Sequence, residues 1–276
     1  MVIAGCGFLG EAAAFLFSES GSQVLGLCAT DATAARLAGR RYEVRTADIT
    51  GSLSEIPPEW RTPDLLIHCA SSGRGGADEY RAIYRDGLSN LLEILAPQRT
   101  IFTGSTSVYA QEDGEWVDEQ SPAEPGRETG RILLEAEGLA LAAGGVVARL
   151  AGIYGPGRSV YLRKFLEGTA VLEAGGSRWT NQIHRDDAAL ALTLLANPSV
   201  PPGIYNVCDD TPATQRDLYG WIAGFLNKPL PPEGPRDPDR KRGWTSKRIS
   251  NAKLRSIGWA PRFASYRDAL PSLGES

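Results

Sequence analysis

Three glycines near the start of the chain have the spacing of a phosphate-binding loop. Gly5, Gly7 and Gly10 end a short apolar run, Met1–Gly5, that indicates a strand, and a helix with an apolar face is predicted over Glu11–Ser20. In such a junction the first glycine permits a tight turn, the second lets the backbone approach a pyrophosphate, and the third lets helix and strand pack closely. The N-terminus of the helix then faces the phosphates.

This loop predicts a dinucleotide-binding site, and the alternative is a glycine turn that serves packing alone. The residues expected to contact the dinucleotide are Gly5, Gly7, Phe8, Leu9 and Gly10.

The end of the next predicted strand, Val24–Cys28, leaves the choice between NAD and NADP open. An acidic residue there favours NAD and a basic one favours NADP. Cys28 stands at that position, with Asp31 three residues later. Three arginines could reach a 2′-phosphate, although a solvated surface suits them better: Arg36, Arg40 and Arg41. We therefore expect NAD or NADP, without a preference.

The first half of the chain alternates strands with helices. Further strands are expected at Tyr42–Ala47, Asp64–Ala70, Thr100–Thr103 and Val146–Leu150, and long helices at Asp78–Leu95 and Thr129–Ala143. Apolar strands separated by helices indicate a parallel sheet that helices cover on both faces. With right-handed crossovers, this pattern predicts an α/β protein with a Rossmann-type, doubly wound parallel sheet.

The second half is less regular. Its predicted elements are helices at Asp186–Ala196 and Gln215–Leu226, a strand at Ile204–Val207 and a small last helix over 249–260. Lys228–Gly243 is rich in proline and charge, which predicts an exposed loop or lid. We expect residues 1–150, with 179–207, to form the dinucleotide-binding domain, and 151–178 with 208–276 to form a small C-terminal substrate-binding lobe. A cleft between them would hold the substrate.

Composition limits the possible partners. The 276-residue chain has a net charge of −4 and is 42% hydrophobic, which is ordinary for a cytoplasmic protein and gives no strong field for nucleic acid. No apolar run approaches the ~20 residues that span a membrane. The four separated cysteines indicate buried thiols in a reducing compartment, and with two histidines no metal site is expected. We therefore expect a cytoplasmic protein without nucleic-acid or membrane partners.

The segment Thr103-Gly104-Ser105-Thr106-Ser107-Val108-Tyr109 resembles the fifth-strand motif of the extended short-chain dehydrogenases/reductases, which include nucleotide-sugar epimerases and dehydratases. Seven further segments resemble this family in the same order along nearly the whole chain: Asp48-Ile49, Ile67–Ala70, Arg149–Arg158, Ile183–Asp187, Ile204–Val207, Arg248–Asn251 and Leu254–Trp259. The resemblance implies that Asp48 and Ile49 contact the adenine. It also implies that Cys69, Ala70 and Ser71 lie along the cofactor.

The chain departs from this family at the catalytic residues. The family uses a serine and a Tyr-x-x-x-Lys pair, in which the lysine lowers the pKa of the tyrosine that transfers the proton. Ser105 falls on the serine position, but Thr129 falls on the tyrosine position and Leu133 on the lysine position. Tyr84 falls on a position that is often asparagine. The resemblance is therefore to atypical extended members that lack the Tyr-x-x-x-Lys pair.

Several side chains are candidates for the missing chemistry, and each has a plainer structural explanation. Tyr109 could replace the lost phenol, or it could pack against its loop, and the same two readings hold for Tyr84. His184 could act as a general base or brace the substrate lobe. Arg74 and Arg158 could contact an anionic substrate.

Two functions remain open. The first is an NAD(P)-dependent oxidoreductase or epimerase-like enzyme with substituted acid/base residues and an unknown small-molecule substrate. The second is a non-catalytic NAD(P)-binding sensor or regulatory protein. The loss of Tyr and Lys favours the sensor, whereas the glycine loop, Ser105 and the substrate lobe favour the enzyme, which we expect. By resemblance, the helices 78–95 and 129–143 would form a homodimer interface.

Overall fold

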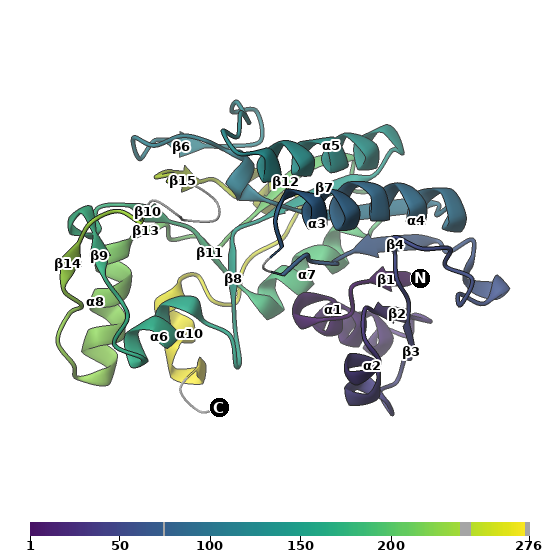
Figure 1. Ribbon diagram of the computed structural model, residues 1–276, viewed down its shortest axis with the longest axis horizontal. Coiled ribbons are helices and arrows are strands. Elements are labelled where there is room, and N and C mark those ends of the chain that lie inside the picture. Colours follow the sequence, from purple (N-terminus) through teal and green to yellow (C-terminus); the bar gives the residue numbers. More distant parts are fainter. Residues whose placement is uncertain (74, 238–243, 274–276) are drawn as a thin grey trace.

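Seven parallel strands form the central sheet of the protein, in the order β12-β7-β5-β4-β1-β2-β3 (Figure 1). The computed structural model describes residues 1–73, 75–237 and 244–273. The strands are β1 (Val2–Ala4), β2 (Leu25–Cys28), β3 (Glu43–Thr46), β4 (Leu65–His68), β5 (Arg99–Ser105), β7 (Val146–Leu150) and β12 (Gly203–Val207). The chain starts at β1 and winds outward on both sides of it, as in a Rossmann fold. The predicted fold class is confirmed.

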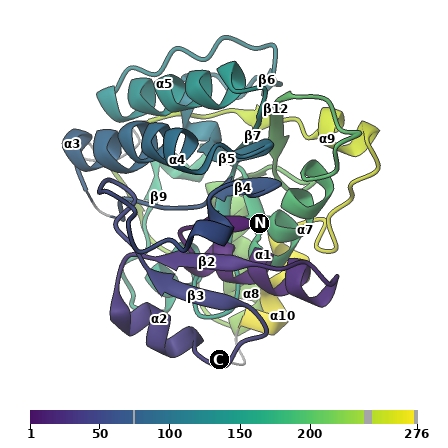
Figure 2. The ribbon, with the colours of Figure 1, turned by 90° about the vertical axis from the view of Figure 1, so that its right-hand side faces the viewer.

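Helices cover both faces of this sheet (Figures 1 and 2). One face carries α1 (Phe8–Glu19), α2 (Asp31–Leu37) and α7 (Arg185–Leu195). The other carries α5 (Glu128–Ala142) and a long helical stretch made of α3 (Ala77–Tyr80), the π-helical segment η2 (Arg81–Asp86) and α4 (Gly87–Leu95). Every residue of β1, β2, β4 and β7 is buried, which explains why these strands are apolar along their whole length.

The remaining elements gather beyond the carboxyl edge of the sheet (Figure 1). The helices there are α6 (Val160–Leu166), α8 (Gln215–Leu226) and α10 (Tyr266–Leu273). They share a separate apolar core that includes Tyr154, Leu162, Leu218, Tyr219, Ile222, Tyr266 and Leu270. Because this cluster has a core of its own, it can form a wall opposite the sheet edge. Its exact boundaries as a lobe stay a prediction.

Short strand pairs connect these helices to the sheet. They are β8 (Gly152–Tyr154) with β11 (Gln182–His184), β9 (Leu172–Glu173) with β14 (Glu233–Gly234), β10 (Trp179–Thr180) with β13 (Ala213–Thr214), and β6 (Trp116–Val117) with β15 (Arg248–Ile249). Single helical turns lie at η1 (Pro58–Trp60), η3 (Thr106–Val108) and η4 (Ala174–Gly176). In the last pair, a segment close to the C-terminus runs beside the loop that follows β5.

Some elements differ from the sequence-based expectation. The helix expected over 249–260 is α9, which covers five residues (Ala252–Ser256). The short helices α2, α6 and α10 were missed, because seven or eight residues span too few turns for a clear apolar period. The loop expected at Lys228–Gly243 includes β14, and its residues 238–243 lie outside the described part of the chain.

A buried ion pair fixes α5 on the sheet. The Arg149 guanidinium on β7 donates from Nη2 to Glu137 Oε2 at 2.6 Å and from Nε to both carboxylate oxygens, and both side chains are less than 5% exposed. The same guanidinium lies 4.8 Å from the centre of the Tyr109 ring. Tyr109 Oη in turn donates to Asn206 Oδ1 on β12 at 3.0 Å. This network joins α5, β7, β12 and the loop after β5.

The helices expected to form a homodimer interface pack side by side. Arg81 and Arg85 of η2 form ion pairs with Glu135 of α5, at 3.0 and 3.2 Å. These pairs are half-exposed, so each contributes little to stability. Homodimerisation stays a prediction.

Replacement of Arg149 by Met should destabilise the protein by about 3–5 kcal/mol, because the Glu137 carboxylate would stay buried without its partner. The double variant Arg149→Met with Glu137→Leu should recover much of this loss, since no charge is then buried. Urea unfolding of the two variants and the wild type measures both values. A double variant as unstable as the single one would contradict this role of the pair.

Candidate functional site

The three glycines of the loop after β1 serve different purposes. Gly5 has a φ of +90°, and a Cβ there would lie 2.3 Å from the backbone nitrogen of Ala70. A Cβ on Gly10 would lie 2.3 Å from the carbonyl oxygen of Gly5. Both positions therefore need glycine for packing alone. A Cβ on Gly7 would meet nothing within 4 Å, so this glycine borders open space, where a ligand can approach the backbone.

Helix α1 begins at Phe8, three residues earlier than the sequence pattern predicted. Phe8, Leu9 and Gly10 thus form its first turn, and no side chain caps its N-terminus. The first backbone N–H groups of a helix have no partner within the helix and carry a partial positive charge. The residues expected to bind a dinucleotide therefore present donors suited to phosphate oxygens.

The residues expected at the adenine lie after β3, at the same edge of the sheet. Asp48 is exposed, and the hydroxyl and backbone N–H of Thr50 both donate to its Oδ1 and hold the pKa of the carboxyl below its usual value. Ile49 is buried, and its carbonyl oxygen accepts from Asn90 Nδ2 of α4 at 2.8 Å. Cys28 turns inward, and its thiol lies 3.7 Å from the carbonyl oxygen of Cys6.

The residues after β4 continue this edge. The backbone nitrogen of Cys69 donates to the carbonyl oxygen of Ala4 at 2.7 Å, and burial raises the pKa of its thiol to about 12. Ser71 Oγ lies 3.5 Å from the Tyr84 hydroxyl. Tyr84 lies in the π-helical segment, where the widened helix lets Nε2 of the buried His68 bond to the Ile83 carbonyl at 3.0 Å. Cys69 and Ala70 thus lie against Gly5, and their expected contact with a cofactor, like that of Ser71, stays a prediction.

A pocket of about 270 Å³ lies beyond the end of β5. The two positions expected to carry the Tyr-x-x-x-Lys pair, Thr129 and Leu133 of α5, both line it, and so does Ser107. Its other lining residues are Tyr80, Ala110, Glu112, Glu124, Pro125, Gly126, Arg127, Gly130, Trp244 and Thr245. Ser105 lies two residues before Ser107, is 9% exposed, and accepts a bond from the Ser107 N–H at 3.2 Å.

Several lining residues of this pocket were not found from the sequence. Tyr80 lies four residues before Tyr84, on the same side of a helix, and this spacing is a signal that could have indicated it. Glu112, Glu124 and Trp244 lie in irregular segments, where no periodicity indicates which way a side chain points.

Tyr109 does not line this pocket. It is fully buried, its hydroxyl donates to Asn206, and burial raises the pKa of the phenol. These contacts agree with the packing explanation, and a catalytic role for Tyr109 stays an untested prediction.

The remaining candidates lie away from this pocket. His184 is buried, and its Nδ1 accepts a bond from the backbone nitrogen of Asp186 at 3.2 Å, so it caps α7. Arg158 lies over the ring of Phe8, at the glycine loop. Arg74 lies outside the described residues.

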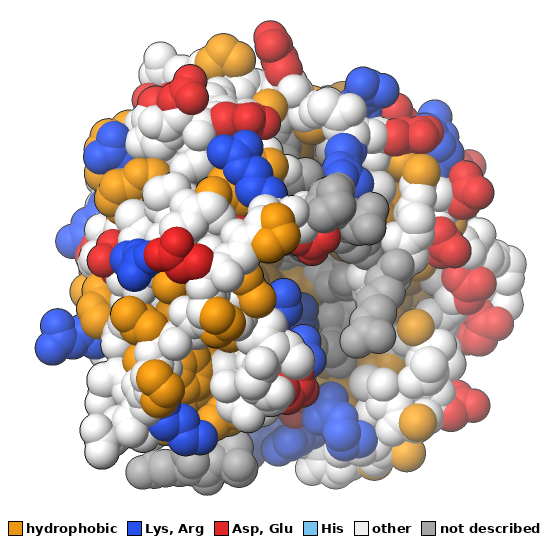
Figure 3. All heavy atoms as spheres, turned by 60° about the vertical axis from the view of Figure 1, so that its left-hand side comes forward, with side chains coloured by type: hydrophobic (Ala, Val, Ile, Leu, Met, Phe, Trp, Pro, Cys, Tyr) orange, Lys and Arg blue, Asp and Glu red, His pale blue; other side chains and the backbone are white. Residues whose placement is uncertain are grey.

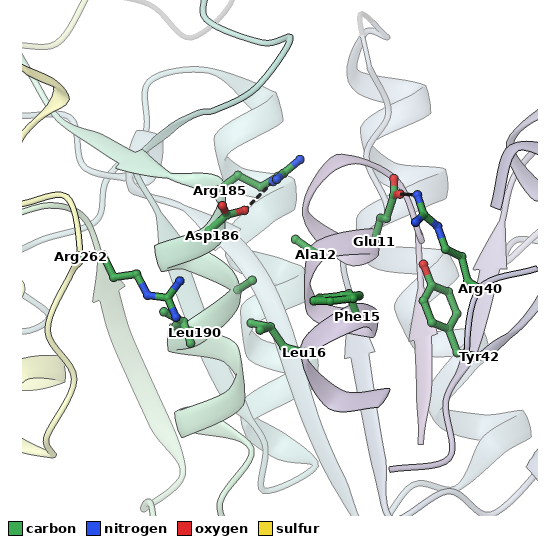
Figure 4. A pocket seen from close by; sticks show the side chains of 11 residues that line it. Glu11, Ala12, Phe15, Leu16, Arg40, Tyr42, Arg185, Asp186, Leu190 and Arg262 are labelled. Atoms are coloured by element: carbon green, nitrogen blue, oxygen red, sulfur yellow. Dashed lines mark hydrogen bonds and ion pairs between the residues drawn. The ribbon is translucent and has the colours of Figure 1, made fainter. Parts of the chain in front are cut away.

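A second pocket, of about 290 Å³, lies between α1 and α7 (Figure 4). Ala12, Phe15, Leu16 and Leu190 form its apolar floor. Its borders carry charged side chains, namely Glu11, Arg40, Arg185, Asp186 and Arg262.

Figure 3 shows another face of the molecule, which is hollowed near its centre and has Lys and Arg side chains beside the hollow.

Lys247 is a buried cation close to the first pocket. Its Nζ donates to the carbonyl oxygen of Tyr109 at 2.5 Å, and its side chain is 4% exposed. Burial, with a smaller contribution from Arg178, lowers the pKa of this ammonium to about 7. Thr245, two residues before Lys247, and Ala110, next to Tyr109, both line the pocket.

The family of the chain follows from comparison with known proteins. The sequence profile of the NAD dependent epimerase/dehydratase family matches residues 1–208. Protein YeeZ of Escherichia coli (strain K12) is 30% identical over 236 residues, which are 82% of this chain and 83% of that protein. The chain belongs to the NAD dependent epimerase/dehydratase family. The expectation of a nicotinamide dinucleotide as cofactor is thereby confirmed.

Solved structures agree with this assignment. A protein from Methylobacillus flagellatus that is described as an NAD-dependent epimerase/dehydratase is 32% identical to this chain. Its structure has a TM-score of 0.81, over 99% of this chain and 96% of that one. The enzyme WbmG of Bordetella bronchiseptica, solved with NAD and UDP, is 15% identical, with a TM-score of 0.82 over 98% of this chain and 91% of that one. At that identity, the likeness shows the fold alone.

Within residues 1–73, 75–237 and 244–273, no helix is long and apolar enough to cross a membrane. The same ranges contain no group of three or more His, Cys, Asp or Glu side chains placed to hold a metal ion.

The low pKa of Lys247 predicts a stability that rises with pH. The folded protein releases this proton near pH 7, whereas the unfolded chain holds it up to the usual pKa of 10.5, so raising the pH between these values favours the folded state. The free energy of unfolding of the wild type, relative to Lys247→Met, should rise by up to about 1.4 kcal/mol per pH unit in this range.

Urea unfolding at three pH values between 7.5 and 9.5 measures this difference, with the pH range set by the pKa of Lys247. Lys253→Met controls for the loss of a lysine that donates to a backbone carbonyl, because Lys253 Nζ donates to the carbonyl oxygen of Ile204. A constant difference between the wild type and Lys247→Met would contradict the prediction.

Proposed function

We propose that this protein is an NAD(P)-dependent oxidoreductase or epimerase whose acid/base residues differ from the Tyr-x-x-x-Lys pair. The pocket beyond β5 is the observation that carries the proposal. Its wall contains Ser107, Thr129 and Leu133, next to the carboxyl edge of a Rossmann-type sheet, which is where such sheets bind their ligands.

The described residues fit a dinucleotide. The pyrophosphate would lie against the open face of Gly7 and the uncapped start of α1, and the adenine near Asp48. The nicotinamide end would then lie along Cys69 to Ser71, toward the pocket. When bound, the nicotinamide cofactor accepts or returns a hydride.

Proton transfer has to come from residues of the chain itself. When a substrate alcohol loses a hydride from its carbon, the hydroxyl proton must pass to a base, and the reverse reaction needs an acid. Thr129 and Leu133 cannot perform this step, because a threonine hydroxyl is far too weak an acid and a leucine carries no proton. Tyr80, with a phenol in the same pocket wall, is the residue that we assign to it.

Ser105 suits the orientation of the reacting oxygen. Its Oγ accepts from the Ser107 N–H, and in the described part of the chain no acceptor takes its own proton. The Ser105 hydroxyl can therefore donate a hydrogen bond to a substrate carbonyl or alcohol oxygen. Glu112 and Glu124 also line the pocket and offer carboxylates to hydroxyl groups of a substrate.

The alternative function, a non-catalytic sensor, is less favoured. A sensor needs a dinucleotide site and a surface that responds to it. It has no use for a pocket of about 270 Å³ beside the expected nicotinamide end.

The purified protein should bind NADH or NADPH with a dissociation constant in the micromolar range, measured by nicotinamide fluorescence. Gly7→Asp should abolish this binding, because it places a carboxylate where the pyrophosphate would lie, while thermal unfolding should change little, since no atom lies within 4 Å of its Cβ. If the wild type binds neither dinucleotide, the proposed function is wrong.

Turnover separates the enzyme from the sensor. On a panel of alcohols and carbonyl compounds with the preferred dinucleotide, the wild type should interconvert the oxidised and reduced cofactor. Ser105→Ala and Tyr80→Phe should each lower kcat by about 100-fold or more, which is typical for the loss of an acid/base or orienting group. Tyr205→Phe is the matched control, because the Tyr205 hydroxyl donates to the carbonyl oxygen of Pro201 and Tyr205 does not line the pocket. Tight dinucleotide binding without turnover on any compound would favour the sensor instead.

A further inference from the structure

Two arginines from outside the glycine loop lie over the same aromatic ring at that loop. The ring belongs to Phe8, the first residue of α1. The guanidinium carbon of Arg158 lies 4.9 Å from the ring centre, and that of Arg185 lies 5.3 Å from it. Arg158 follows β8, and Arg185 is the first residue of α7, so two separate segments bring positive charge to the start of α1.

The loop that carries Arg158 rests directly on this ring. A Cβ added to Gly155 would lie 3.3 Å from Phe8 Cζ and 3.1 Å from Arg185 Cβ. A side chain at position 155 would therefore push the loop away from α1. Because position 155 is glycine, the loop packs closely on α1 and Arg158 stays within reach of the glycine loop.

A buried hydrogen-bond donor, His184 Nε2, lies beside the contact between Gly155 and Phe8. His184 Nε2 has no hydrogen-bond partner, its side chain is 2% exposed, and it would lie 3.5 Å from a Cβ at position 155. Because His184 Nδ1 accepts from the Asp186 N–H and burial lowers the pKa of the ring, the neutral ring carries its hydrogen on Nε2. An unpaired buried N–H is costly, so it indicates a missing acceptor.

The charges at this place call for an anion. Among the described residues, Arg158 has no acidic partner, and Arg185 uses its Nε on Asp186 Oδ1 at 2.8 Å, which leaves its terminal nitrogens for another acceptor. Figure 4 shows Arg185 pointing from the start of α7 toward the first turns of α1. Two guanidinium groups beside an uncapped helix N-terminus create a positive potential that favours a negatively charged ligand.

We propose that Arg158 and Arg185 form a clamp that binds the pyrophosphate of the dinucleotide from the side opposite the glycine loop. The proposal rests on the proposed function, since it assigns further residues to the same cofactor. The dinucleotide is then held by segments on both sides of the cleft. Its binding stabilises the contact between the Gly155 loop and Phe8.

Titration with NADH, followed by nicotinamide fluorescence, tests the clamp. The variants are Arg158→Met, Arg185→Met and the double variant, which remove the charge and keep most of the length of the side chain. Each single variant should weaken binding about tenfold and the double variant about a hundredfold, as expected for charge-assisted hydrogen bonds to phosphate. ADP-ribose, added as a competitor, should lose affinity by the same factors, because it contains the pyrophosphate and lacks the nicotinamide.

Arg262→Met is the matched control, because Arg262 borders the same pocket between α1 and α7 and its guanidinium lies beside Leu190 and not over Phe8 (Figure 4). It should leave the affinity for NADH within twofold of the wild type. Arg158 is exposed, so the variant Arg158→Met should fold. It therefore tests the clamp even if the variant Arg185→Met fails to fold.

The outcomes separate the two proposals. If the wild type binds NADH and both clamp variants stay within twofold of it, or if Arg262→Met loses as much as they do, the clamp is wrong and the proposed function stands. If the wild type binds no dinucleotide, the proposed function is wrong, and the clamp with it.

Discussion

The ion pair between Arg149 and Glu137 is the interaction on which the geometry of the pocket beyond β5 depends. Glu137 belongs to the helix that carries Thr129 and Leu133, and Arg149 belongs to the strand beside β5. The position of the helix on the sheet therefore determines how far the pocket wall lies from the end of β5. A buried pair accepts few alternative geometries, because each charge loses its solvation unless the other stays in place. The stack of Arg149 on Tyr109 extends this constraint to the loop that forms the pocket floor.

The fold could be predicted from the sequence because its signals are local. The glycine spacing and the apolar strands each depend on neighbouring residues, and the parallel sheet follows from their alternation with helices. The boundaries of β7 and α8 agree with the expected ranges, since both segments end at clear breaks in the apolar pattern. The start of α1 was placed too late, because Phe8 and Leu9 belong both to the loop pattern and to the first helical turn.

The candidate site could be predicted only in part. The residues expected to contact the cofactor come from one loop and the ends of neighbouring strands, so the topology brings them together once the sheet order is known. Tyr80 and Trp244 reach the same pocket from segments more than 160 residues apart, and no spacing in the sequence relates them. The contact of Arg185 with Phe8 was missed for the same reason, because a charged residue at a helix start is usually assigned to solvent or to the helix dipole.

The pairing of β15 with β6 places a late segment of the chain against an early loop. Trp244 and Thr245 of this late segment close a pocket whose other walls are made before residue 134. During synthesis, the dinucleotide half can therefore assemble while the pocket is still open. Substitutions in this late segment can therefore reshape the pocket without altering the glycine loop, which lies at the other end of the chain.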